Sequence, residues 1–168
     1  MIDVPRVLTQ QLYAADPLHQ KLVCLSYARH ALLACRSVLG ADESDSALHY
    51  LDVAESLFDG DGTMAALAEA RRGYFTVKIK GSRIAEQITW ISVIAVSACW
   101  QQEMMREGIV RGQFDRIDVH TVAHEGQRVV TLPHEMSTAK GQADAARARW
   151  DEATWQLTHL LETAPYPG

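Results

Sequence analysis

The stretch SRIAEQITWISVIAVSACWQQEMM, residues 82–105, decides the fold class of this chain of 168 residues. Its apolar side chains recur every three or four residues, as on one face of an α-helix. That stripe consists of Ile84, Ile88, Ile91, Ala95, Ala98 and Cys99. Trp90 and Val93 widen the stripe, and Ser82 is a suitable N-cap residue. A helix that is apolar around most of its circumference belongs in the centre of a bundle, so this stretch predicts the central helix of an all-α protein.

Amphipathic helices are predicted on both sides of the central stretch. Asp16 and Pro17 form an N-cap followed by a proline at the first helical position, and Gly40 is a suitable stop. Apolar spacing then indicates helices over residues 17–39, 47–58, 64–72, 114–125 and 139–161. We therefore predict one domain spanning residues 1–168, with about six or seven helices in a bundle or in stacked hairpins.

Two short segments leave a strand open as an alternative. Residues 74–80 alternate apolar and polar side chains, and residues 128–132 read as a short extended segment before Pro133. Because a lone strand has no partner, we favour a continuing or irregular helix for the first segment. If the two segments paired as strands, the fold would be α+β.

The motif FDGDGT, residues 58–63, resembles part of a calcium-binding loop. Setting Gly62 at the glycine position of such a loop places Asp59 and Asp61 correctly, but it puts Leu57 and Ala68 at the first and last ligand positions. Neither side chain can bind calcium. The motif instead predicts a tight corner between two helices, with glycine supplying positive φ and aspartate capping.

The composition excludes several classes of function. The formal net charge is −5, which argues against nucleic-acid binding and favours a basic partner. We predict no membrane span, because the longest nearly uncharged run, residues 88–105, is short of about 20 apolar residues. No secretory signal is visible at the N-terminus, and three cysteines without a C-x-x-C motif argue against a disulfide framework. The expected location is the cytoplasm.

Three histidines form the candidate metal site. His120 and His124 are four residues apart, which on a helix would let both rings reach one ion, and His134 or Glu125 would supply a third ligand. The zinc-protease signature is absent, since neither His-Glu pair is followed by a second histidine at the required spacing. Partly buried or surface histidines are the alternative interpretation.

The sequence offers no catalytic nucleophile and predicts no cofactor. There is no G-x-S-x-G motif and no phosphate-binding glycine loop, and Cys24 and Cys35 lie on apolar stripes where a thiol is inert. Tryptophans concentrate binding energy at protein interfaces, so Trp150 and Trp155 are candidate anchors for a partner.

Residues 24–72 resemble the immunity-5-like proteins of bacterial polymorphic toxin systems. The resemblance covers less than about a third of the chain, and the segment 108–136 departs from it, because later helices of such proteins are typically rich in alanine and histidine. It implies an all-α protein that binds and neutralises a cognate toxin and has no catalytic residues of its own. The matching positions are Cys35-Arg36, Asp42-Glu43-Ser44, Ala54-Glu55, Asp59-Gly60, Leu67-Ala68 and Ala70-Arg71.

The sequence as a whole predicts a helical binding protein, and an immunity protein is the specific form of that hypothesis. The acidic residues Asp42, Glu43 and Asp45, or the loop 108–136, would contact the partner together with an exposed aromatic residue. The acidic charge suits a basic toxin such as a nuclease. The alternatives are a small helical metalloenzyme built on the three histidines and a homo-oligomeric structural protein.

Overall fold

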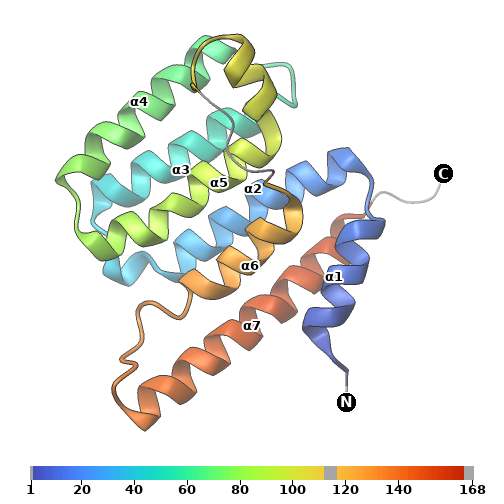
Figure 1. Cartoon of the computed structure of the whole chain (residues 1–168), viewed down its shortest axis with the longest axis vertical. Helices are drawn as coiled ribbons and strands as arrows, with labels where there is room; N and C mark the ends of the chain where they lie inside the picture. Colours follow the sequence, from blue (N-terminus) through green and yellow to red (C-terminus); the bar gives the residue numbers. More distant parts are fainter. Residues whose placement is uncertain (1, 112–116, 165–168) are drawn as a thin grey trace.

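The computed structural model describes residues 2–111 and 117–164, which form seven α-helices and one short 3₁₀ turn (Figure 1). No β-strand occurs in these described residues, so the predicted all-α class is confirmed. The elements are α1 Val4–Ala14, α2 Pro17–Ala34, η1 Arg36–Val38, α3 Ala41–Ser56, α4 Met64–Lys80, α5 Arg83–Arg106, α6 Val119–Val129 and α7 Ala139–Thr163.

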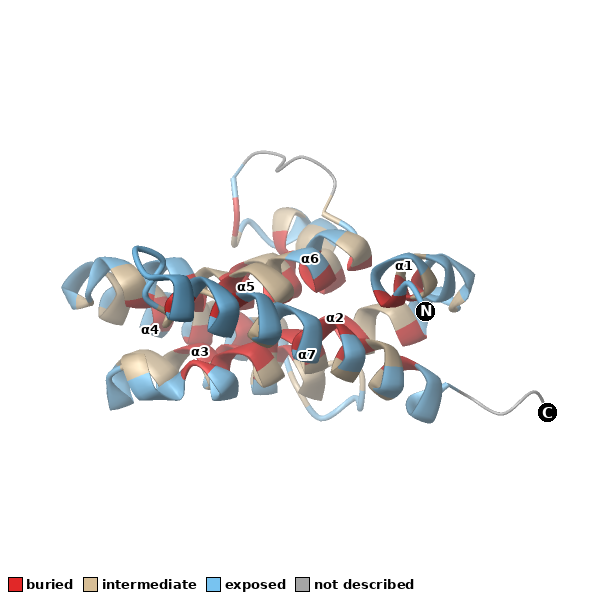
Figure 2. Cartoon of the chain, turned by 90° about the horizontal axis from the view of Figure 1, so that it is seen from below, coloured by how far each residue is buried: buried red, intermediate tan, exposed pale blue. Residues whose placement is uncertain are grey.

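Helix α5 lies at the centre of the fold, as its apolar circumference predicts. It packs against α2, α3 and α6 and also contacts α4. Ile88, Ile91 and Val96 are completely buried in these contacts. Ser82 is the N-cap of this helix, and its hydroxyl accepts a hydrogen bond of 3.2 Å from the backbone N–H of Ala85. Figure 2 shows buried residues concentrated where α2, α3 and α5 meet.

Three buried tyrosines extend the core toward both ends of the molecule. Each hydroxyl has a partner, as a buried polar group requires. Tyr27 donates to the carbonyl of Gln156 over 2.8 Å, joining α2 to α7. The Tyr50 hydroxyl accepts a hydrogen bond of 3.1 Å from the guanidinium of Arg71, which joins α3 to α4. The hydroxyls of Tyr74 and Thr89 lie 3.1 Å apart between α4 and α5.

Helix boundaries differ from the prediction around Gly40. Helix α2 ends at Ala34 and η1 follows, whereas the prediction carried the helix to residue 39. Helix α3 begins at Ala41, so the acidic residues Asp42, Glu43 and Asp45 lie inside the helix instead of preceding it. The reason is local: Gly40 is the N-cap, and the Glu43 carboxylate reaches back to accept a 2.8 Å hydrogen bond from its backbone N–H.

The FDGDGT motif is a corner between α3 and α4. Gly60 has a φ of 77°, which a glycine adopts without strain. The backbone N–H groups of Asp61 and Gly62 each donate to the carbonyl of Ser56 over 3.2 Å. Thr63 then caps α4 by accepting a 3.1 Å hydrogen bond from the N–H of Ala66.

Both segments with open alternatives lack strand structure. Residues 74–80 are the last turns of α4, as favoured from the absence of a partner strand. Residues 128 and 129 end α6, and turns follow up to residue 133. The predicted helix over 114–125 begins partly in residues 112–116, which lie outside the described residues, and α6 starts at Val119 with Asp118 as its N-cap.

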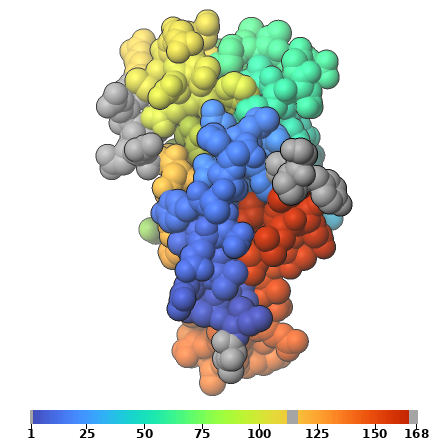
Figure 3. All heavy atoms as spheres, turned by 90° about the vertical axis from the view of Figure 1, so that its right-hand side faces the viewer, coloured from blue at the N-terminus to red at the C-terminus, as the bar shows by residue number. Residues whose placement is uncertain are grey.

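Helix α1 packs along α7 at the end of the molecule opposite to α3 and α4. Figure 3 shows α1 lying directly beside α7 on the surface. The contact buries Val4, Leu8 and Leu12, which share one face of α1 at helical spacing. Among the described helices, none has both the length and the apolar character that a membrane crossing requires.

Candidate functional site

A shallow groove lies between α3 and α4, with a volume of about 380 Å³. Its lining is mostly apolar, and three of the six residues that α4 contributes are small, namely Ala66, Ala70 and Gly73. The lining residues are Ser46, His49 and Val53 from α3, and Ala66, Glu69, Ala70, Gly73, Tyr74 and Val77 from α4. From Ala66 to Val77 the wall runs for about 16 Å along α4, at 1.5 Å per residue.

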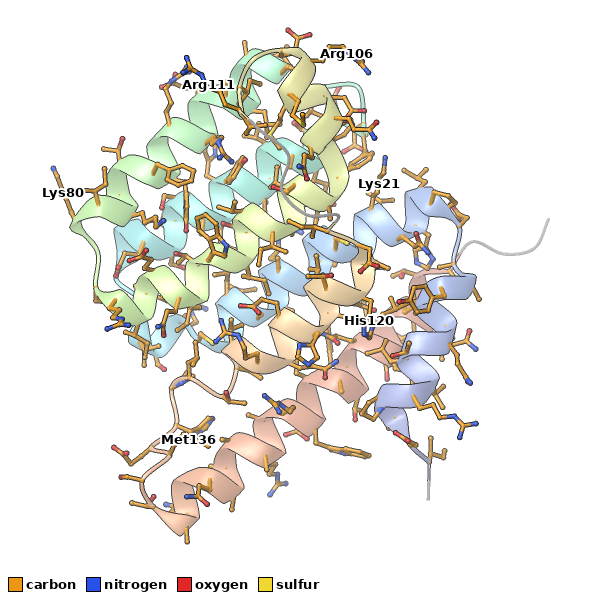
Figure 4. All side chains as sticks on the ribbon, in the orientation of Figure 1. Lys21, Lys80, Arg106, Arg111, His120 and Met136 are labelled. Atoms are coloured by element: carbon orange, nitrogen blue, oxygen red, sulfur yellow. The ribbon has the colours of Figure 1, made fainter. Side chains whose placement is uncertain are left out.

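A second hollow continues the first toward the N-terminus of α3. It has a volume of about 480 Å³ and shares Val77 with its neighbour. Its lining residues are Gly40, Ala41, Asp42, Glu43, Thr76, Val77, Lys80, Gly81 and Ser82. The two hollows together are called the α3–α4 groove. Three of its lining side chains are acidic and one, Lys80, is basic. Figure 4 shows Lys80 projecting outward from the end of α4.

Gly73 shapes the α3–α4 groove from the middle of α4. It is exposed, and a Cβ added there would meet no atom within 4 Å. Glycine inside a helix costs about 1 kcal/mol relative to alanine. Contacts within the described part of the chain therefore do not explain why this position is a glycine. The consequence of Gly73 is a wider groove.

The predicted acidic residues divide into two kinds. Glu43 is structural, because its Oε1 accepts from the N–H of Gly40 over 2.8 Å and its Oε2 from the N–H of Ser82 over 3.2 Å. One carboxylate therefore joins the N-termini of α3 and α5, where negative charge is favourable. Asp42 is exposed and lines the groove, and Asp45 is exposed on α3 beside it. These two carboxylates are the ones accessible to a partner.

The two predicted tryptophan anchors lie on different faces of α7. Five residues separate them, which places them about 140° apart around the helix. Trp150 is 46% exposed. Trp155 is partly buried and stacks on the imidazole of His30 at 3.6 Å and on that of His159 at 4.8 Å, measured between ring centroids. Their role in partner binding stays a prediction for each residue separately.

Away from the α3–α4 groove, a pocket of about 460 Å³ lies between α2, α7 and the turn that follows α6. It is called the α2–α7 pocket. Its lining residues are His30, Ala34, Ser37, Val130, Pro133, His134, Ala148, Asp151, Glu152 and Trp155. Glu152 is only 3% exposed, and its Oε2 lies 2.8 Å from Nδ1 of His30. The sequence-based prediction missed both residues of this contact.

The three candidate metal ligands are not brought together. The His120 ring turns toward α1 and stacks on Tyr13 at 6.0 Å, as its position in Figure 4 indicates. His124 is exposed on α6, and His134 lies beyond the end of α6, in the α2–α7 pocket. In the described residues, no group of three His, Cys, Asp or Glu side chains is close enough to hold a metal ion.

Burial makes the three cysteines poor nucleophiles. Desolvation raises the pKa of the Cys35 thiol to about 12, with a further contribution from the negative charge of Glu152. The same cause raises the pKa of Cys99 to about 12 and that of Cys24 well above its usual value. A thiol with such a pKa is protonated at neutral pH and does not attack a substrate.

Comparison of the chain with protein-family models, with curated proteins and with solved structures finds no match. The resemblance of residues 24–72 to immunity-5-like proteins therefore stays a prediction, and the function rests on the two cavities described above.

Proposed function

We propose that this chain is a helical binding protein that holds a segment of a basic protein partner in the α3–α4 groove. The observation that carries the proposal is Gly73, an exposed glycine in a helix interior that lines the groove and where an added Cβ would meet no atom of the described residues within 4 Å. Retaining it costs helix stability, by about 1 kcal/mol. A partner that packs closely against α4 accounts for that cost.

The dimensions of the groove suit a helix of the partner. Amphipathic helices commonly bind by laying an apolar face into a hydrophobic groove, with anchors at helical spacing. The wall of about 16 Å along α4 accommodates about three turns of such a helix. Small residues at positions 66, 70 and 73 let the two backbones approach closely.

Charge favours a basic partner. Asp42 is exposed at one end of the groove, Asp45 is exposed three residues further along α3, and the whole chain carries a formal charge of −5. Such charge mainly accelerates encounter with a positively charged partner, while the apolar floor supplies affinity. Neutralisation of a basic toxin, the function that the immunity-5-like resemblance implies, is the specific form of this proposal.

Filling the groove tests the proposal. The probe is the product of a toxin gene located next to the gene for this chain, and calorimetry measures its affinity. Gly73→Trp places a large side chain in the groove and is expected to weaken binding by at least about 100-fold, as for a blocked interface centre. Gly73→Ala adds one methyl group at the same place and is expected to weaken binding less, by about tenfold, because the close approach requires glycine. Ala65→Trp, at an exposed position of α4 that lines neither hollow, is the matched control and should bind within about threefold of the parent chain.

A charge-reversal pair tests the electrostatic part. Asp42→Lys is expected to slow association, and this effect should shrink as salt is added. Asp144→Lys makes the same charge change at an exposed position of α7 that lines neither cavity. Equal affinity of the parent chain and the Gly73→Trp variant for the probe would reject the groove as the binding site.

A further inference from the structure

The α2–α7 pocket has a feature that the α3–α4 groove lacks, a nearly completely buried carboxylate. Glu152 is 3% exposed, and a charge is rarely buried unless it is fully paired. Its Oε2 is 2.8 Å from Nδ1 of His30, but its Oε1 has no hydrogen-bond partner in the described part of the chain. An unsatisfied buried carboxylate oxygen calls for an explanation, such as a bound ion or ligand.

The pocket around Glu152 is negatively charged. Asp151, which is exposed, lines it as a second carboxylate, and neither lysine nor arginine stands among its described lining residues. The basic side chains among these lining residues are the two imidazoles of His30 and His134. A positively charged group in this pocket would therefore meet two carboxylates and no competing permanent cation.

The remaining walls are apolar and aromatic. Ala34, Val130, Pro133 and Ala148 line the pocket together with Trp155. The Trp155 ring is held in place by stacking on His30 and His159. The stacked indole contributes apolar ring carbons that pack against methylene groups. The volume of about 460 Å³ is within the usual range for a small-molecule site.

We propose that the α2–α7 pocket binds an organic cation, namely an ammonium or guanidinium group at the end of a short aliphatic chain. The charged group pairs with Asp151 and Glu152, and the aliphatic chain packs against Val130, Pro133 and Ala148. Two sources share this chemistry, a free small-molecule amine and a Lys or Arg side chain of a protein. The inference is independent of the α3–α4 groove.

The test is a titration of the full chain followed by NMR of the Trp155 indole N–H, assigned with a Trp155→Phe variant. The probes are n-butylammonium and n-butylguanidinium, and 1-butanol is the neutral control of the same length. Both cations are expected to shift the resonance saturably and to bind at least about tenfold more tightly than 1-butanol, because each gains a charged hydrogen bond.

Two single-site variants separate the pocket from general surface charge. Asp151→Asn is expected to weaken cation binding by about tenfold. The matched control is Asp144→Asn, which makes the same change at an exposed position two turns earlier in α7 and outside the pocket. Since Asp151 and Asp144 are both exposed, neither variant should impair folding, and thermal unfolding followed by circular dichroism checks this.

A third probe distinguishes the two sources of the cation. N-acetyl-arginine-N-methylamide presents the guanidinium from a peptide backbone. If it binds as tightly as n-butylguanidinium, a protein side chain is the ligand, and if only the free cations bind, a small molecule is; both results support the pocket. The proposal is overturned if the Trp155 resonance does not move, if it responds equally to 1-butanol, or if Asp151→Asn and Asp144→Asn have the same effect.

Discussion

The α3–α4 groove and the α2–α7 pocket are both hollows between packed helices, but they are open for opposite reasons. The α3–α4 groove is open because α4 has small residues at positions 66, 70 and 73. The α2–α7 pocket contains large side chains, among them a buried carboxylate and a stacked indole. The first surface suits a partner whose side chains fill the groove. The second suits a cationic group that pairs with the buried carboxylate.

Glycine has a different role in the two regions, and a substitution at the glycine near the α2–α7 pocket has the largest expected effect on the free energy of unfolding. A Cβ at Gly141, in the first turn of α7, would overlap the backbone carbonyl of Glu135. Glu135 directly follows His134, so the glycine sets the path of the turn that forms one wall of the α2–α7 pocket. Gly141→Ala should therefore force a backbone shift and lower the free energy of unfolding by about 3 kcal/mol.

Urea denaturation measures the change at Gly141, and NMR shows where the structure responds. Resonances of the turn and of Trp155 should shift, whereas those of α3 and α4 should stay in place. An undisturbed Trp155 resonance would mean that the turn can move without affecting the pocket, which would weaken the link between Gly141 and the site.

The buried carboxylate should contribute to ligand binding at the expense of stability. Glu152→Met keeps a similar volume and removes a buried carboxylate whose Oε1 has no hydrogen-bond partner in the described residues, so it also removes the desolvation cost of that oxygen. His30 remains 35% exposed in its side chain, so its Nδ1 can bond to water. We expect a gain of about 1 kcal/mol in the free energy of unfolding.

The same Glu152→Met variant should lose affinity for n-butylguanidinium. A variant that is both less stable and unchanged in cation binding would show that Glu152 is a structural residue, and would remove the contrast between the two cavities.

The α3–α4 groove makes the converse prediction at Gly73. Because a Cβ there meets nothing, Gly73→Ala should stabilise α4 by about 0.5–1 kcal/mol through helix propensity alone. Thermal or urea unfolding measures this gain. A loss of stability would show that the groove cannot accept even a methyl group, and that Gly73 is kept for packing within the chain.

Local signals predicted the helices well, while contacts between distant segments were not predictable. Ser82 and Asp16 cap α5 and α2 as their residue types indicate, and apolar spacing located the central helix. In contrast, His30 and Glu152 are 122 residues apart, and no local pattern joins them. The available clue was a glutamate on the buried face of α7 with Ala145 and Gln156, because an acidic residue there needs a partner.

The candidate sites show the same limit. Asp42 was predicted from its charge and does line a groove, but the complete capping role of Glu43 depends on Ser82, 39 residues away. The i, i+4 spacing of His120 and His124 was sound helical geometry. That spacing alone could not indicate that α1 packs against α6 and that the His120 ring stacks on Tyr13 of α1.

The smallest expected effect is the change in stability with pH that His159 of α7 causes. Burial lowers the pKa of His159 below its ordinary value of 6.5, and the nearby His19 and His30 lower it further, against an opposing contribution from Glu162. The unfolded chain therefore binds a proton at His159 before the folded chain does, so stability falls as the pH drops below about 6.5. Glu152 and Thr163 contact His30 and His19 on the facing side, and Trp155 stacks on His159.

A His159→Gln variant isolates this contribution. Its urea midpoint should fall less than that of the parent chain between pH 7.5 and 5.0, because it lacks the proton uptake of His159, while other titrating groups affect both chains alike. His49→Gln, at an exposed position of the α3–α4 groove, is the control and should follow the parent chain. Identical pH dependence in the His159→Gln variant and the parent chain would show that protonation is accommodated without loosening α7, and that the two cavities do not differ in their response to acid.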